Sequence, residues 1–132
     1  MEAVEQWDLI GDSEASTVCV HNKAAFVLKW HMNWNHTKSE ESEHFPVGKT
    51  HCMDIAEALP GIQDGDHVKV HVDATAGKTE KADHAVVYKA DSLGTTTFRA
   101  HGTTFHFKVE DEDDWYMLNQ YERFATRFAT VF

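Results

Sequence analysis

Histidine is the most unusual residue type in this chain, with ten copies in 132 residues. Three of them, His31, His71 and His106, lie on the polar faces of segments in which apolar residues alternate with polar ones. Imidazole nitrogens bind zinc or copper at about 2.0–2.1 Å. If the strands that carry them are neighbours, these histidines converge on a metal site. The alternative, which we favour, is that they are polar residues on a solvated sheet face.

The two cysteines are compatible with three different states. Cys19 and Cys52 both lie on the non-core faces of predicted strands. Two reduced thiols are the favoured state for a cytosolic chain, while a cross-strand disulfide, or a metal site shared with His21 or His51, would also suit their positions. A count of two does not decide among these states.

Catalytic signatures are missing from the sequence. It contains no Gly-x-Ser-x-Gly, Walker loop, Gly-x-Gly-x-x-Gly or His-Glu-x-x-His motif. No arrangement singles out a nucleophile or a general base, so we predict no catalytic residue and no enzyme. We expect no cofactor either, apart from the copper or zinc ion of a histidine-based metal site.

The charge of the chain restricts its partners. Twelve Lys and Arg against 22 Asp and Glu give a net charge of −10 at pH 7. This charge repels phosphate backbones and anionic lipid headgroups, which disfavours nucleic acid and membrane surfaces. The N-terminus has acidic residues where a secretory signal needs a basic start, and no apolar stretch approaches the ~20 residues of a membrane span. We expect a cytoplasmic protein as written, or a secreted one if a signal peptide was removed before the numbering.

Strands must position these residues. In "FVLKWHMNW" the apolar side chains from Phe26 to Trp34 recur at every second position, which predicts a strand over residues 24–35 with Trp30 and Trp34 in the core. Similar alternation predicts strands over 16–22, 45–55, 67–74 and 84–90, and two more within 95–110 that separate at His101-Gly102, the second burying Phe105. The spacing is typical of an antiparallel, immunoglobulin-like β-sandwich of about seven strands, occupying residues 1–110.

Residues 111–132 have a different pattern, which predicts a C-terminal helical extension. The acidic run "EDEDD" suits a helix N-terminus, and the aromatic and aliphatic residues after it recur at intervals of three or four. We expect an amphipathic helix from Asp113 to about Ala129. Its apolar stripe must pack back on the sandwich or dock on a neighbouring copy. The residues of this predicted interface are Trp115, Leu118, Tyr121, Phe124 and Phe128.

Four stretches between Val20 and Val109 carry a resemblance to known proteins. In order, they are "VHNKAAFVLK", "FPVGKTHCMDI", "DATAGKT" and "GTTFHFKV". Together they resemble small single-domain β-sandwich proteins of algae, protists and bacteria that have no settled function. The layout also resembles that of small cytolysin-like sandwiches such as the aegerolysins. Neither resemblance assigns a site residue, and the predicted C-terminal helix lies outside both.

These observations favour a non-enzymatic β-sandwich module for protein–protein contact or self-assembly, acting through the C-terminal aromatic stripe and an exposed strand edge. The first alternative is a histidine-based copper or zinc binding protein. The second is a carbohydrate- or lipid-binding sandwich of the lectin or cytolysin type, although Trp30 and Trp34 belong to a core face rather than to a sugar-stacking surface.

Overall fold

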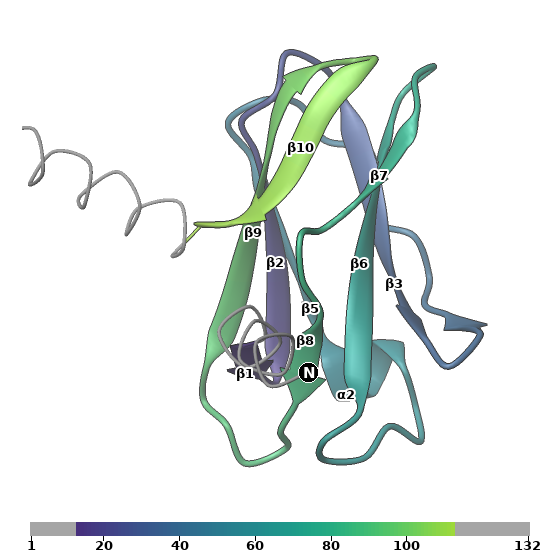
Figure 1. Ribbon diagram of the computed structural model, residues 1–132, viewed down its shortest axis with the longest axis vertical. Coiled ribbons are helices and arrows are strands. Elements are labelled where there is room, and N and C mark those ends of the chain that lie inside the picture. The colour runs from purple at the N-terminus through teal and green to yellow at the C-terminus, as the bar shows by residue number, and fades with distance from the viewer. Residues whose placement is uncertain (1–12, 113–132) are drawn as a thin grey trace, which may run out of the picture.

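The computed structural model describes residues 13–112, which form two β-sheets packed face to face (Figure 1). The described residues are mainly β, as predicted, with one short helix that follows β5. The elements are β1 (Ser13–Ala15), β2 (Thr17–Asn22), β3 (Leu28–Trp34), β4 (Thr37–Lys38), β5 (Thr50–Asp54), α2 (Ile55–Ala58), β6 (His67–Ala74), β7 (Thr79–Lys81), β8 (Val86–Tyr88), β9 (Thr95–Thr103) and β10 (His106–Asp111).

Both sheets are mixed rather than purely antiparallel. The first has the order β1-β8-β6-β3-β4, with β7 also paired to β6, and the second has the order β10-β9-β2-β5. β1 runs parallel to β8, and β2 runs parallel to β9. The reason is that β1 and β2 are one extended stretch that passes from the first sheet to the second at Ser16. The stretch therefore forms one parallel pair in each sheet, β1 with β8 and β2 with β9. The short strands β1, β4 and β7 have too few residues to show alternation in the sequence.

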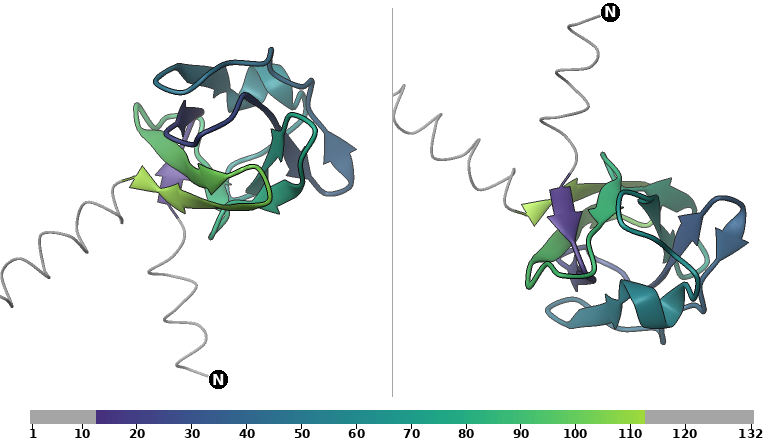
Figure 2. Two further views of the ribbon diagram at one scale, coloured as in Figure 1. Left: turned by 90° about the horizontal axis from the view of Figure 1, so that it is seen from above. Right: turned by 90° about the horizontal axis from the view of Figure 1, so that it is seen from below.

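Buried side chains from both sheets form one hydrophobic cluster. Figure 2 shows the two sheets facing each other, and this cluster lies between them. Trp30 and Met32 of β3 are fully buried, and the aliphatic side chains of β6 are buried beside them. The second sheet contributes Val18, Val20 and Phe98, which are also fully buried. Burying a side chain of this size stabilises the fold by roughly 1.5–3 kcal/mol. Trp34, expected in the core, is only half-buried and packs against its margin.

Two serine hydroxyls attach residues 39–45 to β3. The hydroxyls of Ser39 and Ser42 accept hydrogen bonds from the backbone N–H groups of Met32 (2.8 Å) and Trp30 (2.9 Å). The backbone N–H groups of the same serines donate back to the carbonyls of Met32 and Trp30, each at 2.8 Å. The serine side chains thus substitute for a regular strand ladder, and the segment runs beside β3 before it crosses to the second sheet.

The turn between the last two strands is not where the sequence placed it. β9 continues through His101-Gly102 to Thr103, so the turn lies at Thr104-Phe105. Phe105 stands at this turn with 62% of its surface exposed, whereas we expected it to be buried. Gly102 has φ 126°, and a Cβ there would lie 2.3 Å from the carbonyl oxygen of His106. This glycine permits close contact within a continuous hairpin rather than ending a strand.

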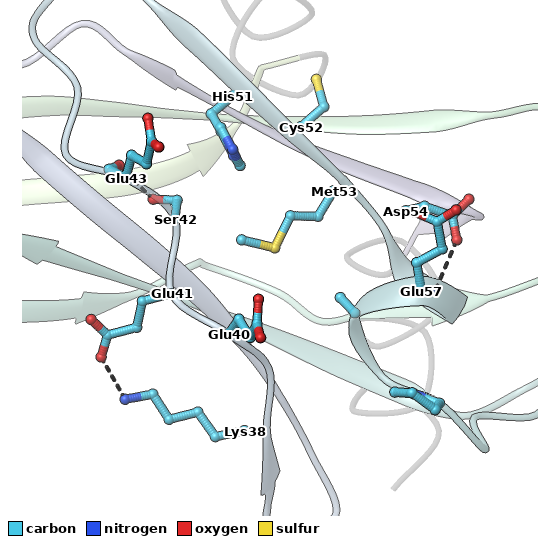
Figure 3. Close-up of a pocket in the computed structure, with 12 residues that line it drawn as sticks. Lys38, Glu40, Glu41, Ser42, Glu43, His51, Cys52, Met53, Asp54 and Glu57 are labelled. Carbon is cyan, nitrogen blue, oxygen red and sulfur yellow. Dashed lines mark hydrogen bonds and ion pairs between the residues drawn. The ribbon is translucent and has the colours of Figure 1, made fainter.

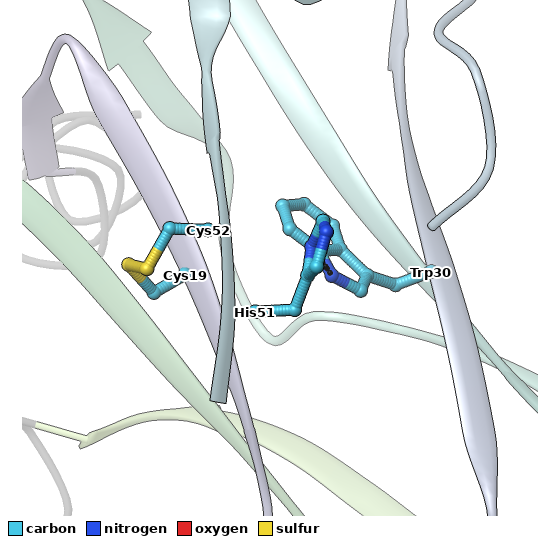
Figure 4. Close-up of a disulfide and its surroundings, with 4 residues drawn as sticks. All are labelled: Cys19, Trp30, His51 and Cys52. Atoms are coloured by element: carbon cyan, nitrogen blue, oxygen red, sulfur yellow. Dashed lines mark hydrogen bonds between the residues drawn. A yellow bond between two sulfur atoms is a disulfide. The ribbon is translucent and has the colours of Figure 1, made fainter. Parts of the chain in front are cut away.

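Cys19 and Cys52 form a disulfide between β2 and β5. The prediction of two reduced thiols was therefore wrong, and their sulfurs are not available as thiolate ligands beside His21 or His51. The two cysteines lie directly opposite each other in the antiparallel register, with their Cα atoms 4.0 Å apart. Figure 4 shows the disulfide on one side of β5 and the His51 ring on the other side, directed toward Trp30.

Replacing Cys19 and Cys52 by alanine together should lower the free energy of unfolding by about 3–4 kcal/mol. The reason is that the crosslink joins residues 33 apart and restricts the unfolded chain. Urea denaturation with and without a reductant measures the effect. The reductant should destabilise the parent protein and leave the double variant unchanged; equal stability of all four samples would contradict the prediction.

Candidate functional site

The outer face of β3 and β6 brings two of the predicted histidines together. His31 lies directly opposite His71 in the antiparallel register, and their rings stack with centroids 5.1 Å apart. His106 lies on β10 in the other sheet. The structure therefore pairs His31 with His71 and does not bring all three histidines to one point.

His31 is unusually enclosed for an outward-facing residue, with only 6% of the surface of the whole residue exposed. Burial, together with the positive charge of Lys38, lowers the pKa of His31. Burial and the charge of Lys81 lower the pKa of His71, whose Nε2 accepts a hydrogen bond from the Asn33 side-chain amide at 3.1 Å. Both imidazoles are therefore neutral at pH 7.

Two carboxylates, those of Glu41 and Asp73, lie beside His31. Lys29 and Lys38 both bind Glu41, the latter at 2.7 Å. These hydrogen bonds lower the pKa of Glu41 to about 2, and the one from Lys29 is the larger cause. Alternation along β6 places Asp73 on the same face as His71, so the sequence carries a signal for Asp73. Glu41 comes from a segment without periodicity, and no signal in the sequence indicates it.

A groove lies between residues 38–43 and the β5–α2 region (Figure 3). We call it the edge groove; its volume is about 760 Å³. In Figure 3 the Met53 side chain extends from β5 toward the segment that carries Glu40 and Glu41. Five carboxylates and one lysine line the groove, which suits a positively charged ligand. The lining residues are Lys38, Glu40, Glu41, Ser42, Glu43, His51, Cys52, Met53, Asp54, Glu57, Ala58 and Pro60.

β5 presents an open edge to this groove. The N–H of Asn22 donates to the carbonyl of Lys49 at 2.9 Å, and the N–H of Ile55 donates to the carbonyl of Ser16 at 3.0 Å. Because residues of an antiparallel strand alternate between bonding and non-bonding positions, Thr50 and Cys52 direct their backbone N–H and C=O groups away from β2. Within residues 13–112 no strand pairs with that side of β5.

The histidines near the cysteines have other partners. His21 Nδ1 lies 3.2 Å from Glu112 Oε1 on the outer face of the second sheet. His51 faces the opposite way and accepts a hydrogen bond from the Trp30 indole N–H at 3.2 Å. The structure therefore does not bring His21, His51 and the cysteine sulfurs to one site.

A buried ion pair between His84 and Asp111 is a feature that sequence reasoning missed. His84 Nε2 lies 3.0 Å from Asp111 Oδ2, and His84 Nδ1 lies 2.9 Å from the carbonyl oxygen of Ala85. Since both ring nitrogens face acceptors, both carry protons and the ring is a cation. Burial opposes this charge, but the hydrogen bonds and the nearby Asp83 carboxylate outweigh it and raise the pKa of His84 to about 9.

The predicted interface residues Trp115, Leu118, Tyr121, Phe124 and Phe128 lie outside the described residues, as does the rest of the predicted C-terminal helix. Among the residues that are described, no helix is both long enough and apolar enough to cross a membrane.

Comparison with known proteins gives little further information. No family of proteins matches the chain, and no curated protein matches it. The solved structures that resemble it include pneumolysin, with 16% identity and a TM-score of 0.39 over 74% of this chain and 23% of that one. The membrane-binding domain of pneumolysin, solved separately, shows 15% identity and a TM-score of 0.38 over 74% of this chain and 95% of that domain. Similarity this weak supports no conclusion about function.

The His84–Asp111 pair predicts a pH-dependent stability. The pKa of His84 is raised from 6.5 to about 9 on folding, so its contribution is complete below pH 6.5 and is lost as the pH rises through about 9. The free energy of unfolding should fall by up to about 3 kcal/mol over this window. Urea denaturation across the pH range measures it. His84→Gln should remove the decline and His106→Gln, on the exposed face of β10, should retain it; an unchanged decline in His84→Gln would contradict the assignment.

Proposed function

We propose that the protein is a non-enzymatic contact module that binds an extended, positively charged segment of a partner protein along β5. The observation that carries this proposal is the open edge of β5 beside the acidic edge groove. Addition of a strand to an exposed sheet edge is a recurring mode of peptide recognition. In that mode the main-chain hydrogen bonds supply affinity, and the side-chain pockets supply specificity.

The backbone of β5 suits this mode. Thr50 and Cys52 offer two N–H donors and two C=O acceptors on the side of β5 that faces away from β2, which is the repeating pattern that an added antiparallel strand needs. The disulfide fixes β5 to β2, so the edge is held in place before a ligand arrives. A preformed edge lowers the ordering entropy that binding must overcome.

The side chains around the edge groove favour a basic ligand. Glu40 and Glu43 are exposed on the segment facing β5, while Glu41 is already bound by Lys29 and Lys38. Successive side chains of an added strand point alternately to the two faces of the sheet. Lysine or arginine at alternate positions would therefore meet the carboxylates, and apolar residues would meet Met53.

A fluorescein-labelled peptide of about ten residues with alternating lysine and valine tests the proposal. We expect it to bind in fluorescence anisotropy at low ionic strength, and we expect an otherwise identical peptide with glutamate in place of lysine not to bind. Added salt should weaken the binding, because the attraction between exposed charges is screened.

The Glu40→Lys/Glu43→Lys double variant should weaken binding of the lysine peptide by at least about tenfold. The matched control is Glu14→Lys/Asp91→Lys, which changes the net charge equally at exposed positions outside the groove lining. The control should stay close to the parent protein. Equal weakening in both double variants would show non-specific charge attraction and would contradict a site at β5.

The predicted C-terminal helix supplies a second contact surface in this proposal, through self-association of its apolar stripe. In a helix from Asp113 to Ala129, the double variant Leu118→Asp/Phe124→Asp places two negative charges on the apolar stripe. The matched control, Asn119→Asp/Gln120→Asp, places the same charge on the other side of the helix. Size-exclusion chromatography with light scattering should show an oligomer for the parent and the second variant and a monomer for the first. A monomeric parent at high concentration would contradict self-association.

A further inference from the structure

The Nδ1 atom of His31 is a buried polar atom that has no hydrogen-bond partner. The side chain is 8% exposed, so water has little access to it. Its nearest carboxylate atom is Asp73 Oδ2, at 3.8 Å. A buried nitrogen in this position carries a desolvation penalty that no contact within the described residues offsets.

Neither neutral form of the imidazole satisfies this geometry. With the proton on Nδ1, the 3.8 Å separation from Asp73 Oδ2 is too long for a hydrogen bond. With the proton on Nε2, the Nδ1 lone pair is buried next to the negative Asp73 carboxylate, which repels it. A cation placed between the ring and the carboxylates would satisfy the lone pair and the carboxylates together.

The distances fit a shared metal ion. Ligand atoms of His31, Glu41 and Asp73 all lie within 4.8 Å of one another. Two ligand atoms at about 2.1 Å from one zinc ion are at most about 4.2 Å apart. His31 Nδ1 and Asp73 Oδ2, which are 3.8 Å apart, already lie within this limit. Glu41 is on an exposed loop, and a shift of its carboxylate by less than about 1 Å would bring it into range.

We infer that His31, Asp73 and Glu41 form a binding site for a divalent transition-metal ion of the zinc or copper class. An imidazole with two carboxylates is a donor set that such ions accept, whereas calcium and magnesium prefer oxygen ligands alone. This ligand set differs from the one that the sequence suggested, because His31 is kept and two carboxylates replace His71 and His106. It goes beyond the proposed contact function.

Neighbouring residues orient the ligands. The Thr79 hydroxyl donates to Oδ1 of Asp73, which leaves Oδ2 directed toward His31. The His71 ring stacks on His31 and is itself held by Asn33. Partners of this kind, bound to the ligands rather than to the ion, fix ligand geometry in metal sites.

Two lysines compete with the ion for Glu41. Lys29 and Lys38 both bind its carboxylate, and the Lys38 side chain is 52% exposed. Each oxygen of Glu41 is bonded to one of these ammonium groups, so a metal ion on either oxygen would meet a nearby positive charge and would weaken at least one of the two ion pairs. Removal of Lys38 should therefore strengthen metal binding, an effect that an unrelated surface metal site would not show.

Isothermal titration of the untagged, full-length protein with Zn²⁺ tests the inference. We expect one ion per chain, and affinity reduced by at least about tenfold in His31→Asn and in Asp73→Asn. His106→Asn is the matched control and should bind as the parent does. Circular dichroism shows whether each variant folds. Asp73 is partly exposed, so Asp73→Asn gives an independent result if His31→Asn does not fold.

Lys38→Gln should bind Zn²⁺ up to about fivefold more tightly, the fold-change equivalent to one exposed ion pair. Lys108→Gln, on the second sheet, should leave the affinity unchanged. Absence of stoichiometric zinc binding, or binding that is equal in the parent, His31→Asn and Asp73→Asn, would overturn the inference. Because the titration contains no peptide, its failure is separate from failure of the proposed contact function.

Discussion

The antiparallel register between β3 and β6 is the constraint on which the other features of this protein depend. It places Trp30 and Val72 opposite each other in the core and His31 opposite His71 on the outer face. A slip of one residue in either strand would turn its apolar side chains to solvent and its histidine into the core. The hydrophobic effect therefore fixes the position of the polar residues as firmly as that of the apolar ones.

The segment that follows β4 connects this face to the edge groove. Ser39 and Ser42 bond to the backbone of β3, and this attachment holds the intervening Glu40 and Glu41 at the surface. Glu41 contributes both to the groove lining and to the cluster around His31. The proposed contact site and the inferred metal site are therefore adjacent, and an ion that withdrew Glu41 from Lys38 would alter the charge at the groove.

The disulfide and the open edge of β5 are consequences of one arrangement. β5 is the last strand of its sheet, so half of its backbone groups have no strand partner among the described residues. An unpaired edge is prone to fraying and to indiscriminate pairing with other chains. The Cys19–Cys52 crosslink opposes fraying, and the carboxylates beside the edge oppose pairing with acidic or neutral strands. In the proposed contact module, these two features would make the edge selective for basic strands instead of leaving it open to indiscriminate pairing.

The sequence by itself determined which faces of the longer strands are buried, because a period of two can be read from β3 and β6 without knowing their neighbours. It predicted a mainly β fold, the burial of Trp30 and the outward positions of His31 and Cys19. It did not predict the parallel pairs made by the stretch that changes sheet at Ser16, or the pairing of the cysteines, since both depend on strand order. Only the tertiary structure showed that Glu41 lies beside His31 and that His84 pairs with Asp111. Both contacts join residues far apart in the sequence, and local periodicity carries no information about such contacts.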